Sequence, residues 1–197
     1  VLKEILLAIE DYNGQPITRL MLKFLPMVPL RAENLTTLKW EMISFHNKTL
    51  TIPRNEMKDK NEELPDFVLP LASQVIEILK ETKQLTGWGK WVFHGLQNIN
   101  GPMNPETGNK ALRSLGFTDE EKGRKQTQHS FRGTYRSLAE TYQTQHNATY
   151  EVKESVLDHH DTSKVAFAYL HKADYTEQMR PLLQWWADFI DTLKKST

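Results

Sequence analysis

His129-Ser130-Phe131-Arg132 opens the most informative stretch of this sequence, because His159 and Tyr169 follow it before residue 170. Arginine presents a planar fork of N–H donors that matches phosphate oxygens, and histidine donates to the same oxygens or carries a proton near neutral pH. Tyrosine is a weak nucleophile at its usual pKa of about 10, but nearby cations favour its ionised form and a covalent intermediate. The ordered series predicts a metal-free phosphodiester site that forms a phosphotyrosyl link.

The composition is that of an ordinary globular domain. Of the 197 residues, 39% are hydrophobic and 25% are charged, and there is no cysteine for a disulfide or a thiolate metal site. No apolar run approaches the roughly 20 residues that span a bilayer. The chain has 25 Lys plus Arg and 25 Asp plus Glu, so its formal net charge is zero. This charge balance argues neither for nor against a nucleic-acid partner. We expect a cytoplasmic protein without membrane association.

The N-terminal part combines helix and strand patterns. Apolar residues at helical spacing predict helices over 3–12 and 17–28, the second ending near Val28 because prolines follow. A short helix is expected after Arg31, running through Trp40.

Strand-like runs follow at 49–53 and 67–71, and they predict a small antiparallel sheet or hairpin around a polar stretch. A helix is expected over about 72–85, a short buried segment at 91–93, and a loop over 94–108, where Asn, Gly and Pro are scattered.

The C-terminal part is helical. A first helix is expected after Pro105, and Gly116 and the charged stretch 118–127 separate it from the next. The spacing predicts further helices over about 129–142, 151–158, 162–171 and 175–194, with the polar segment 143–149 as a loop. The expected fold is therefore mostly α with a small antiparallel β-sheet, in one domain that covers 1–197.

The candidate nucleophile and the paired histidines each leave an alternative open. Tyr175, six residues after Tyr169, is the rival phenol. His159-His160 invites a metal site, but adjacent histidines point in different directions on a helix and no HExxH spacing accompanies them. We therefore expect no metal and no cofactor, with His159 as the histidine that faces the site.

A lysine and an arginine far from this stretch complete the set. Lys58 lies between the two expected strands, where a lysine is usually solvated but could also protonate a leaving oxygen, and Lys60 competes for that role. Arg31 follows a proline-stiffened segment at the start of a helix, a place where an anion could bind. On local grounds alone, an ordinary solvated arginine is the simpler interpretation of Arg31.

The last helix carries a wide apolar stripe. Its members are Leu182, Trp186, Phe189 and Leu193, flanked by further apolar residues. Such stripes usually pack on their own core, and a terminal one could instead serve a neighbouring subunit.

With these residues in order, the chain resembles the catalytic domain of tyrosine recombinases, and among them the phage and genomic-island integrases. The resemblance covers nearly the whole sequence. The matching motifs are Pro29-Leu30-Arg31-Ala32-Glu33-Asn34-Leu35 with Leu38-Lys39-Trp40, Thr51-Ile52-Pro53 through Met57-Lys58, Val68-Leu69-Pro70-Leu71, His129-Ser130-Phe131-Arg132, Val156-Leu157-Asp158-His159, Ala168-Tyr169, and Ala173-Asp174-Tyr175 running into Gln184-Trp185-Trp186-Ala187-Asp188.

The resemblance implies that Arg31 and Arg132 hold the scissile phosphate of DNA and that His159 bonds to it. This agrees with the chemistry of the residues, in which preorganised donors stabilise the charge of the transition state. Asn34 departs from the family pattern, which commonly has an acidic residue there to support the first arginine.

The same resemblance implies which residues act as general acid, as proton-transfer group and as nucleophile. Lys58 would be the general acid for the 5′-hydroxyl, His129 would assist proton transfer, and Tyr169 would form the 3′-phosphotyrosyl link. A DNA-binding or assembly module that keeps the fold without chemistry is the alternative, although a pure binding role does not require the phenol. A relaxase similar to type IB topoisomerases is a variant within the enzyme class.

The implied partners are duplex DNA attachment sites, a homotetramer on synapsed DNA, and accessory DNA-bending or excision factors in a bacterial or phage-encoded, nucleoid-associated system. The chain begins at Val1 without an initiator Met, which predicts a fragment. The family's core-binding and arm-binding domains are not in this sequence, and we expect the isolated fragment to be a monomer.

Overall fold

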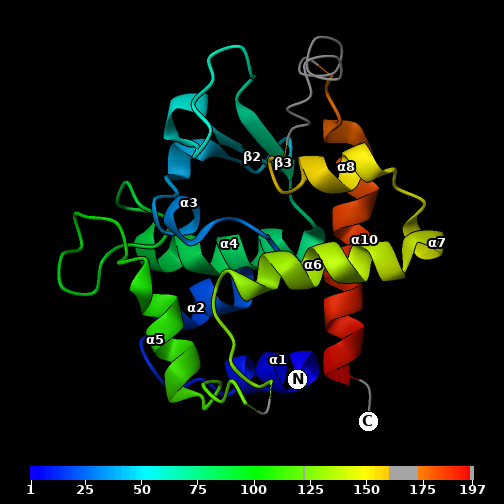
Figure 1. Cartoon of the computed structure of the whole chain (residues 1–197). Helices are drawn as coiled ribbons and strands as arrows, with labels where there is room; N and C mark the ends of the chain where they lie inside the picture. Colours follow the sequence, from blue (N-terminus) through cyan, green and yellow to red (C-terminus); the bar gives the residue numbers. More distant parts are fainter. Residues whose placement is uncertain (122, 160–172, 196–197) are drawn as a thin grey trace.

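The computed structural model describes residues 1–121, 123–159 and 173–195, and Figure 1 shows how their elements are arranged. The described strands are β1 (Ile43–Ser44), β2 (Thr49–Ile52) and β3 (Phe67–Pro70), and the short 3₁₀ helices are η1 (Trp40–Met42) and η2 (Arg54–Glu56). The described α-helices are α1 (Leu2–Glu10), α2 (Pro16–Phe24), α3 (Ala32–Thr36), α4 (Ser73–Thr86), α5 (Glu106–Ser114), α6 (Ser130–Thr141), α7 (Gln143–His146), α8 (Tyr150–Ser155) and α10 (Thr176–Lys195).

The helix α2 begins with Pro16, whose fixed φ suits a first helical position. Its apolar side chains are buried against α1 and α4, as the helical spacing predicted. The prediction that this helix reaches Val28 is wrong, because it ends at Phe24. Pro26 follows within two residues and has no N–H to continue the helical bonding, and the backbone N–H groups of Met27 and Val28 both donate to the Phe24 carbonyl instead.

The short helix α3 begins directly after Arg31, as predicted, but it ends at Thr36 rather than at Trp40. The backbone at Lys39 pairs with Trp91 in an antiparallel bridge, and the Trp40 N–H donates to the Lys90 carbonyl. These bonds to a distant segment compete with helix extension, so the backbone turns into η1 instead.

The strands form one antiparallel sheet in the order β1-β2-β3. Leu50 pairs with Leu69 and Ile52 with Phe67, so apolar side chains from both predicted strands share one buried face. The two strands predicted from the sequence are confirmed, and β1 adds a third that the sequence analysis did not anticipate. A strand of two residues is too short to show an alternating pattern.

The helix α10 carries the apolar stripe, and it docks on its own domain. It runs from the sheet end of the molecule past α6 to α1, as the orange-to-red ribbon of Figure 1 shows. Trp186 is fully buried, its indole N–H donates to the Pro26 carbonyl at 2.8 Å, and its ring meets Tyr135 of α6 edge to face. At its far end, Lys194 lies 3.2 Å from Glu10 of α1.

Two further predictions for the C-terminal part have different outcomes. The segment 143–149, predicted as a loop, contains the single helical turn α7, which ends at His146 and is followed by Asn147 with a φ of 55°. Polar residues can form such a turn when their side chains bond locally, and Gln143 donates to the Ala148 carbonyl. The helix predicted over 162–171 lies outside the described residues.

The fold class is as predicted: mostly α, with a small antiparallel sheet at one end. The helices α4 and α6 and the buried segment around Val92 and Phe93 also match their predictions. Among the residues that the structure describes, no helix is both long enough and apolar enough to cross a bilayer.

Candidate active site

Arg132 lies at the centre of the candidate site, on the first turn of α6. Phe131 and Tyr135 of the same helix are buried in the core and fix its rotation. One terminal nitrogen of Arg132 donates to the Pro29 carbonyl at 2.6 Å, and the other donates to the Leu157 carbonyl at 2.8 Å. The guanidinium is therefore held between the residues that precede α3 and those that follow α8.

Burial gives this guanidinium an unusual electrostatic state. Arg132 is only 6% exposed. Burial, and then the nearby positive charge of Arg31, lower the pKa of Arg132 to about 10, although the charges of Asp158 and Glu154 partly oppose the shift. The side chain remains charged at neutral pH but lacks full compensation, which favours the arrival of an anion.

Arg31 reaches the same region from the N-terminal end of α3. Its backbone is extended, its side chain is a quarter exposed, and its Nη1 lies 3.8 Å from a carboxylate oxygen of Asp158. Asn34, the departure from the family pattern, is buried one turn later, and its amide donates to the Glu56 carbonyl at 3.1 Å. Asn34 thus ties α3 to η2, while the carboxylate beside Arg31 comes from Asp158.

His159 follows α8 and contacts Arg132 directly. Its Nε2 lies 3.3 Å from Nη2 of Arg132, and its Nδ1 lies 2.8 Å from Oε2 of Glu154. A guanidinium only donates hydrogen bonds, so Nε2 is the acceptor and Nδ1 carries the proton that goes to Glu154. The backbone N–H of His159 also donates to the Glu154 carbonyl, which fixes the imidazole at two points.

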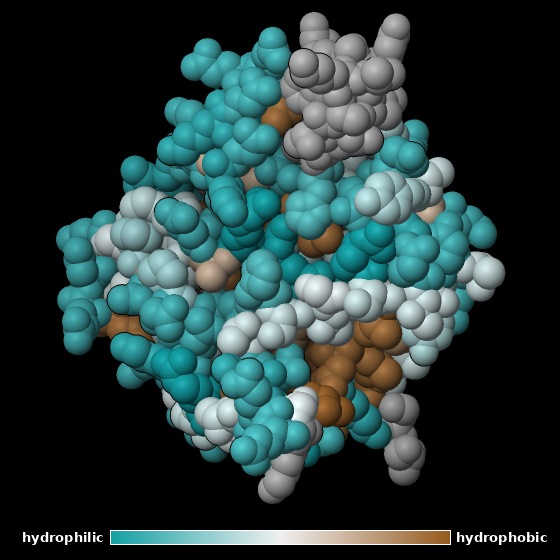
Figure 2. All heavy atoms as spheres, in the orientation of Figure 1, coloured by the Kyte–Doolittle hydropathy of each residue, from teal (hydrophilic) through white to brown (hydrophobic). Residues whose placement is uncertain are grey.

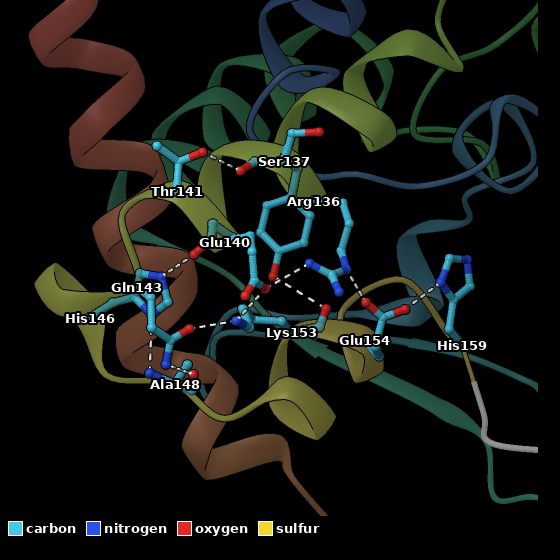
Figure 3. A network of polar contacts seen from close by, with 12 residues as sticks. Arg136, Ser137, Glu140, Thr141, Gln143, His146, Ala148, Lys153, Glu154 and His159 are labelled. Atoms are coloured by element: carbon cyan, nitrogen blue, oxygen red, sulfur yellow. Dashed lines mark hydrogen bonds and ion pairs between the residues drawn. The ribbon is translucent and has the colours of Figure 1, made fainter.

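Glu154 belongs to a chain of charged groups along α6 and α8, drawn in Figure 3. Its other carboxylate oxygen accepts from Nε of Arg136, and Arg136 also pairs with Glu140 at 2.9 Å. Lys153, almost fully buried, donates to the same Glu140 at 2.7 Å. The sequence analysis missed this network. The only signal for it was acids and bases that share helical faces, which many solvated helices also show.

Asp158, next to His159, is a further residue whose role was not predicted from the sequence. It is buried, adopts a φ of 53°, and receives a bidentate pair from Arg54 of η2 with distances of 3.2 and 3.0 Å. A buried aspartate requires such partners, and the left-handed conformation turns the chain from α8 towards His159. The sequence offered only the acid itself as a signal, because its partner stands about a hundred residues earlier in the chain.

The structure places the remaining candidates as follows. His129 precedes α6, three residues from Arg132, and its side chain is exposed. Lys58 is exposed in the connection between η2 and β3. Tyr175, the rival nucleophile, is partly buried against the core. Tyr169 and His160 lie outside the described residues.

Figure 2 shows that hydrophilic side chains cover the face between α3, α6 and α8, whereas an apolar area lies on the other side of α6 near the end of α10. No group of three or more His, Cys, Asp or Glu residues within the described part of the chain is placed to hold a metal ion. Two guanidiniums and an imidazole nevertheless suit a phosphate, since each can donate to a non-bridging oxygen. The arrangement can bind a phosphodiester and stabilise the added charge of its pentacoordinate transition state.

Comparisons with known proteins agree with this geometry. The model of the phage integrase family matches residues 1–175. IntB of Escherichia coli (strain K12) is 31% identical over 202 residues, covering 95% of this chain and 48% of that protein. The prophage integrase IntA of the same organism is 33% identical over 152 residues, covering 77% and 33%, and the integrase of Enterobacteria phage P4 is 28% identical over 199 residues, covering 95% and 43%.

The chain thus spans about half or less of the length of these relatives. The family model covers most of it and includes both arginines, both histidines of the candidate site and Lys58. On this ground, the chain belongs to the phage integrase family.

Proposed function

We propose that this chain is the catalytic domain of a site-specific DNA recombinase, which cleaves and rejoins strands to integrate or excise a mobile element. The observation that carries the proposal is the contact between Arg132 and His159, with Arg31 close enough to lower the pKa of Arg132. Three phosphate-binding groups from distant segments meet there, and family membership makes DNA the expected source of that phosphate.

In this proposal, Arg31 and Arg132 hold the non-bridging oxygens of the scissile phosphate. His159 gives up its contact with Arg132 and donates to the phosphate from Nε2, which requires protonation at that nitrogen. The Glu154 carboxylate accepts from Nδ1 and orients the imidazole. The exposed His129, which directly precedes α6, assists proton transfer.

The phenol of Tyr169 gives up its proton, which His129 helps to transfer, and its oxygen attacks the phosphorus and forms a 3′-phosphotyrosyl bond, while the bond from phosphorus to the 5′-oxygen breaks. Lys58 donates the proton that this oxygen takes up. The exposed side chain of Lys58 approaches the phosphate when DNA is present. Attack by a 5′-hydroxyl on the phosphotyrosine reverses the step and rejoins a strand.

The partner is duplex DNA at attachment sites in the cytoplasm of a bacterium, and we propose a homotetramer on synapsed DNA, assisted by DNA-bending or excision factors. This domain alone has no net positive charge. Phosphate contacts supply most non-specific affinity, so we expect residues 1–197 alone to bind duplex DNA weakly and to be monomeric.

Covalent trapping tests the nucleophile. In the full-length protein, a nicked duplex that releases the short strand should accumulate a protein–DNA adduct, and mapping should find it on Tyr169. Tyr169→Phe should abolish the adduct and leave DNA binding intact, because only the attacking oxygen is lost. Tyr175→Phe is the control and should keep the adduct.

An adduct that persists in Tyr169→Phe and disappears in Tyr175→Phe would overturn the assignment of the nucleophile. A wild-type protein that binds the site without any adduct would instead identify a binding module and contradict the proposed enzyme.

A further inference from the structure

The pair Arg54–Asp158 joins two segments that each carry a candidate catalytic group. Arg54 begins η2 directly after β2, four residues before Lys58, and Asp158 directly precedes His159. The guanidinium and the carboxylate form two parallel contacts of 3.2 and 3.0 Å, and both side chains are buried, at 8% and 1% exposure.

The other donors of Arg54 bind the segment around Lys58. Its Nε donates to the Pro65 carbonyl at 2.8 Å, and its Nη1 also donates to the Asp59 carbonyl at 3.2 Å. Its backbone N–H donates to the Asp66 carboxylate at 2.8 Å. The Arg54 side chain therefore binds residues near both ends of the connection between η2 and β3. Its contact with Asp59 holds the backbone immediately after Lys58.

Asp158 connects this anchor to the phosphate-binding groups. One of its carboxylate oxygens lies 3.8 Å from Arg31, and the carbonyl just before it, that of Leu157, accepts from Arg132. The backbone conformation of Asp158, with a φ of 53°, directs the chain towards His159. A single buried carboxylate thus contacts one arginine that holds the Lys58 segment and another that faces the phosphate.

We propose that Arg54 and Asp158 act as positioning residues, which fix the base of the Lys58 segment against the phosphate-binding groups so that the lysine reaches the leaving 5′-oxygen. The inference rests on the proposed function, in which Lys58 is the general acid. Lys58 itself remains exposed, so its side chain is free to move while its backbone is held.

The geometry favours positioning over simple stabilisation. A buried ion pair often adds little net stability, because the cost of removing two charges from water offsets their attraction. The planar fork of Arg54 nevertheless satisfies four acceptor atoms on three residues at defined angles, which a shorter or apolar residue would not reproduce. Such an arrangement specifies where a segment lies, and misplacement of a catalytic group by about 1 Å can cost roughly 100-fold in rate.

Arg54→Lys in the full-length protein is the main test. Lysine keeps a positive charge beside Asp158 but cannot bind Asp59, Pro65 and Asp158 together. On an ordinary suicide substrate, the single-turnover cleavage rate should fall by roughly 10- to 100-fold, less than the roughly 10²- to 10⁴-fold that a general acid contributes. DNA affinity should change by less than about threefold, because Arg54 is buried and its donors are taken up by protein acceptors rather than by the phosphate.

The decisive measurement uses a duplex whose scissile 5′-bridging oxygen is sulfur, because a thiolate leaves without protonation. Lys58→Ala should regain nearly the wild-type rate on this duplex, which tests the proposed acid. Arg54→Lys should be rescued to the same degree, which tests the positioning role. If Lys58→Ala is rescued and Arg54→Lys stays slow, the proposed function stands and the inference is wrong. If Lys58→Ala is not rescued, the general-acid assignment itself fails.

Two further variants protect the test against trivial unfolding. Asp158→Asn keeps the shape and removes the charge, and it should lower the rate on both duplexes, because it also touches Arg31. Arg180→Gln is the control: Arg180 also donates to hairpin carbonyls, those of Asn47 and Lys48, but at the other end of β2. It should cleave both duplexes like the wild type, and a defect there equal to that of Arg54→Lys would refute a role specific to Lys58.

Discussion

Replacement of Glu154 by glutamine should separate the catalytic part of the charged network from its structural part. One carboxylate oxygen of Glu154 accepts from Nδ1 of His159, and the other accepts from Nε of Arg136. A glutamine amide offers one acceptor and one donor group. Whichever way it turns, Glu154→Gln therefore sets its NH₂ against either the imidazole N–H or the guanidinium N–H.

The magnitude follows from these contacts. The Glu154 side chain is 13% exposed, so its hydrogen bonds are largely shielded from water. A hydrogen bond to a charged group is worth about 1.5–3 kcal/mol, and one such bond is lost or weakened. We expect the free energy of unfolding to fall by about 1–3 kcal/mol.

The cleavage rate of Glu154→Gln should fall by more than its reduced folding stability explains. Without the carboxylate beside Nδ1, the imidazole of His159 loses the acceptor that orients it, and each 1.4 kcal/mol lost from the transition state lowers the rate about tenfold. We expect cleavage of a suicide substrate to slow by roughly 10- to 100-fold. The assay measures single-turnover cleavage, alongside denaturant unfolding of the same preparation.

Glu140→Gln is the matched control. Glu140 contacts Arg136 and Lys153 in the same network but does not contact His159 (Figure 3). It should affect folding while leaving the cleavage rate of the folded protein unchanged. Equal losses of cleavage rate in the two variants, or a wild-type rate in Glu154→Gln, would refute the assignment of Glu154 as the residue that orients His159.

Two other predictions concern the chemistry and the terminal helix. Cleavage of a suicide substrate should survive excess EDTA, since two arginines and the histidines already supply donors for the phosphate; a strict magnesium requirement in the chemical step would reopen the metal interpretation of His159 and His160. Trp186→Ala should lower the free energy of unfolding by about 3–5 kcal/mol, because the side chain is fully buried. Trp186→Phe should lower it by about 1–3 kcal/mol, because the indole hydrogen bond to the Pro26 carbonyl is lost. Equal losses for the two variants in denaturant titrations would contradict the view that packing of the aromatic ring holds α10 on the domain.

Sequence periodicity predicted the elements whose order depends on local pattern. The strands β2 and β3 and the helices α4, α6 and α10 each bury one regular face, and that face is visible in the residues themselves. The errors fall where distant contacts decide the outcome. The predicted helix after Arg31 is cut short because the backbone of Lys39 pairs with that of Trp91. Trp91 lies far along the chain, so no local pattern around Lys39 reveals this contact.

The candidate site divides in the same way. His129, Arg132 and His159 were found because their chemistry identifies them in a short stretch of sequence, and the structure brings Arg132 and His159 into contact. Arg54 and Asp158 were missed because neither is distinctive alone, and only the fold shows that they meet. A residue that positions another is recognised by the partner it contacts, and a single sequence does not show which residues are partners.

Arg132 explains how a chain with zero net charge could still attract the proposed DNA partner. In the described structure, its terminal nitrogens donate to the Pro29 and Leu157 carbonyls and to the neutral imidazole of His159, none of which carries a negative charge. Its lowered pKa, about 10, records the resulting cost of burial. Because that pKa lies below the value of an exposed arginine, the charged form opposes folding at neutral pH, and stability should rise only as pH increases beyond about 10. A bound phosphate supplies the missing anion and relieves this cost. The attraction for DNA at this point is therefore local, and it depends on one undercompensated guanidinium rather than on the charge balance of the whole chain.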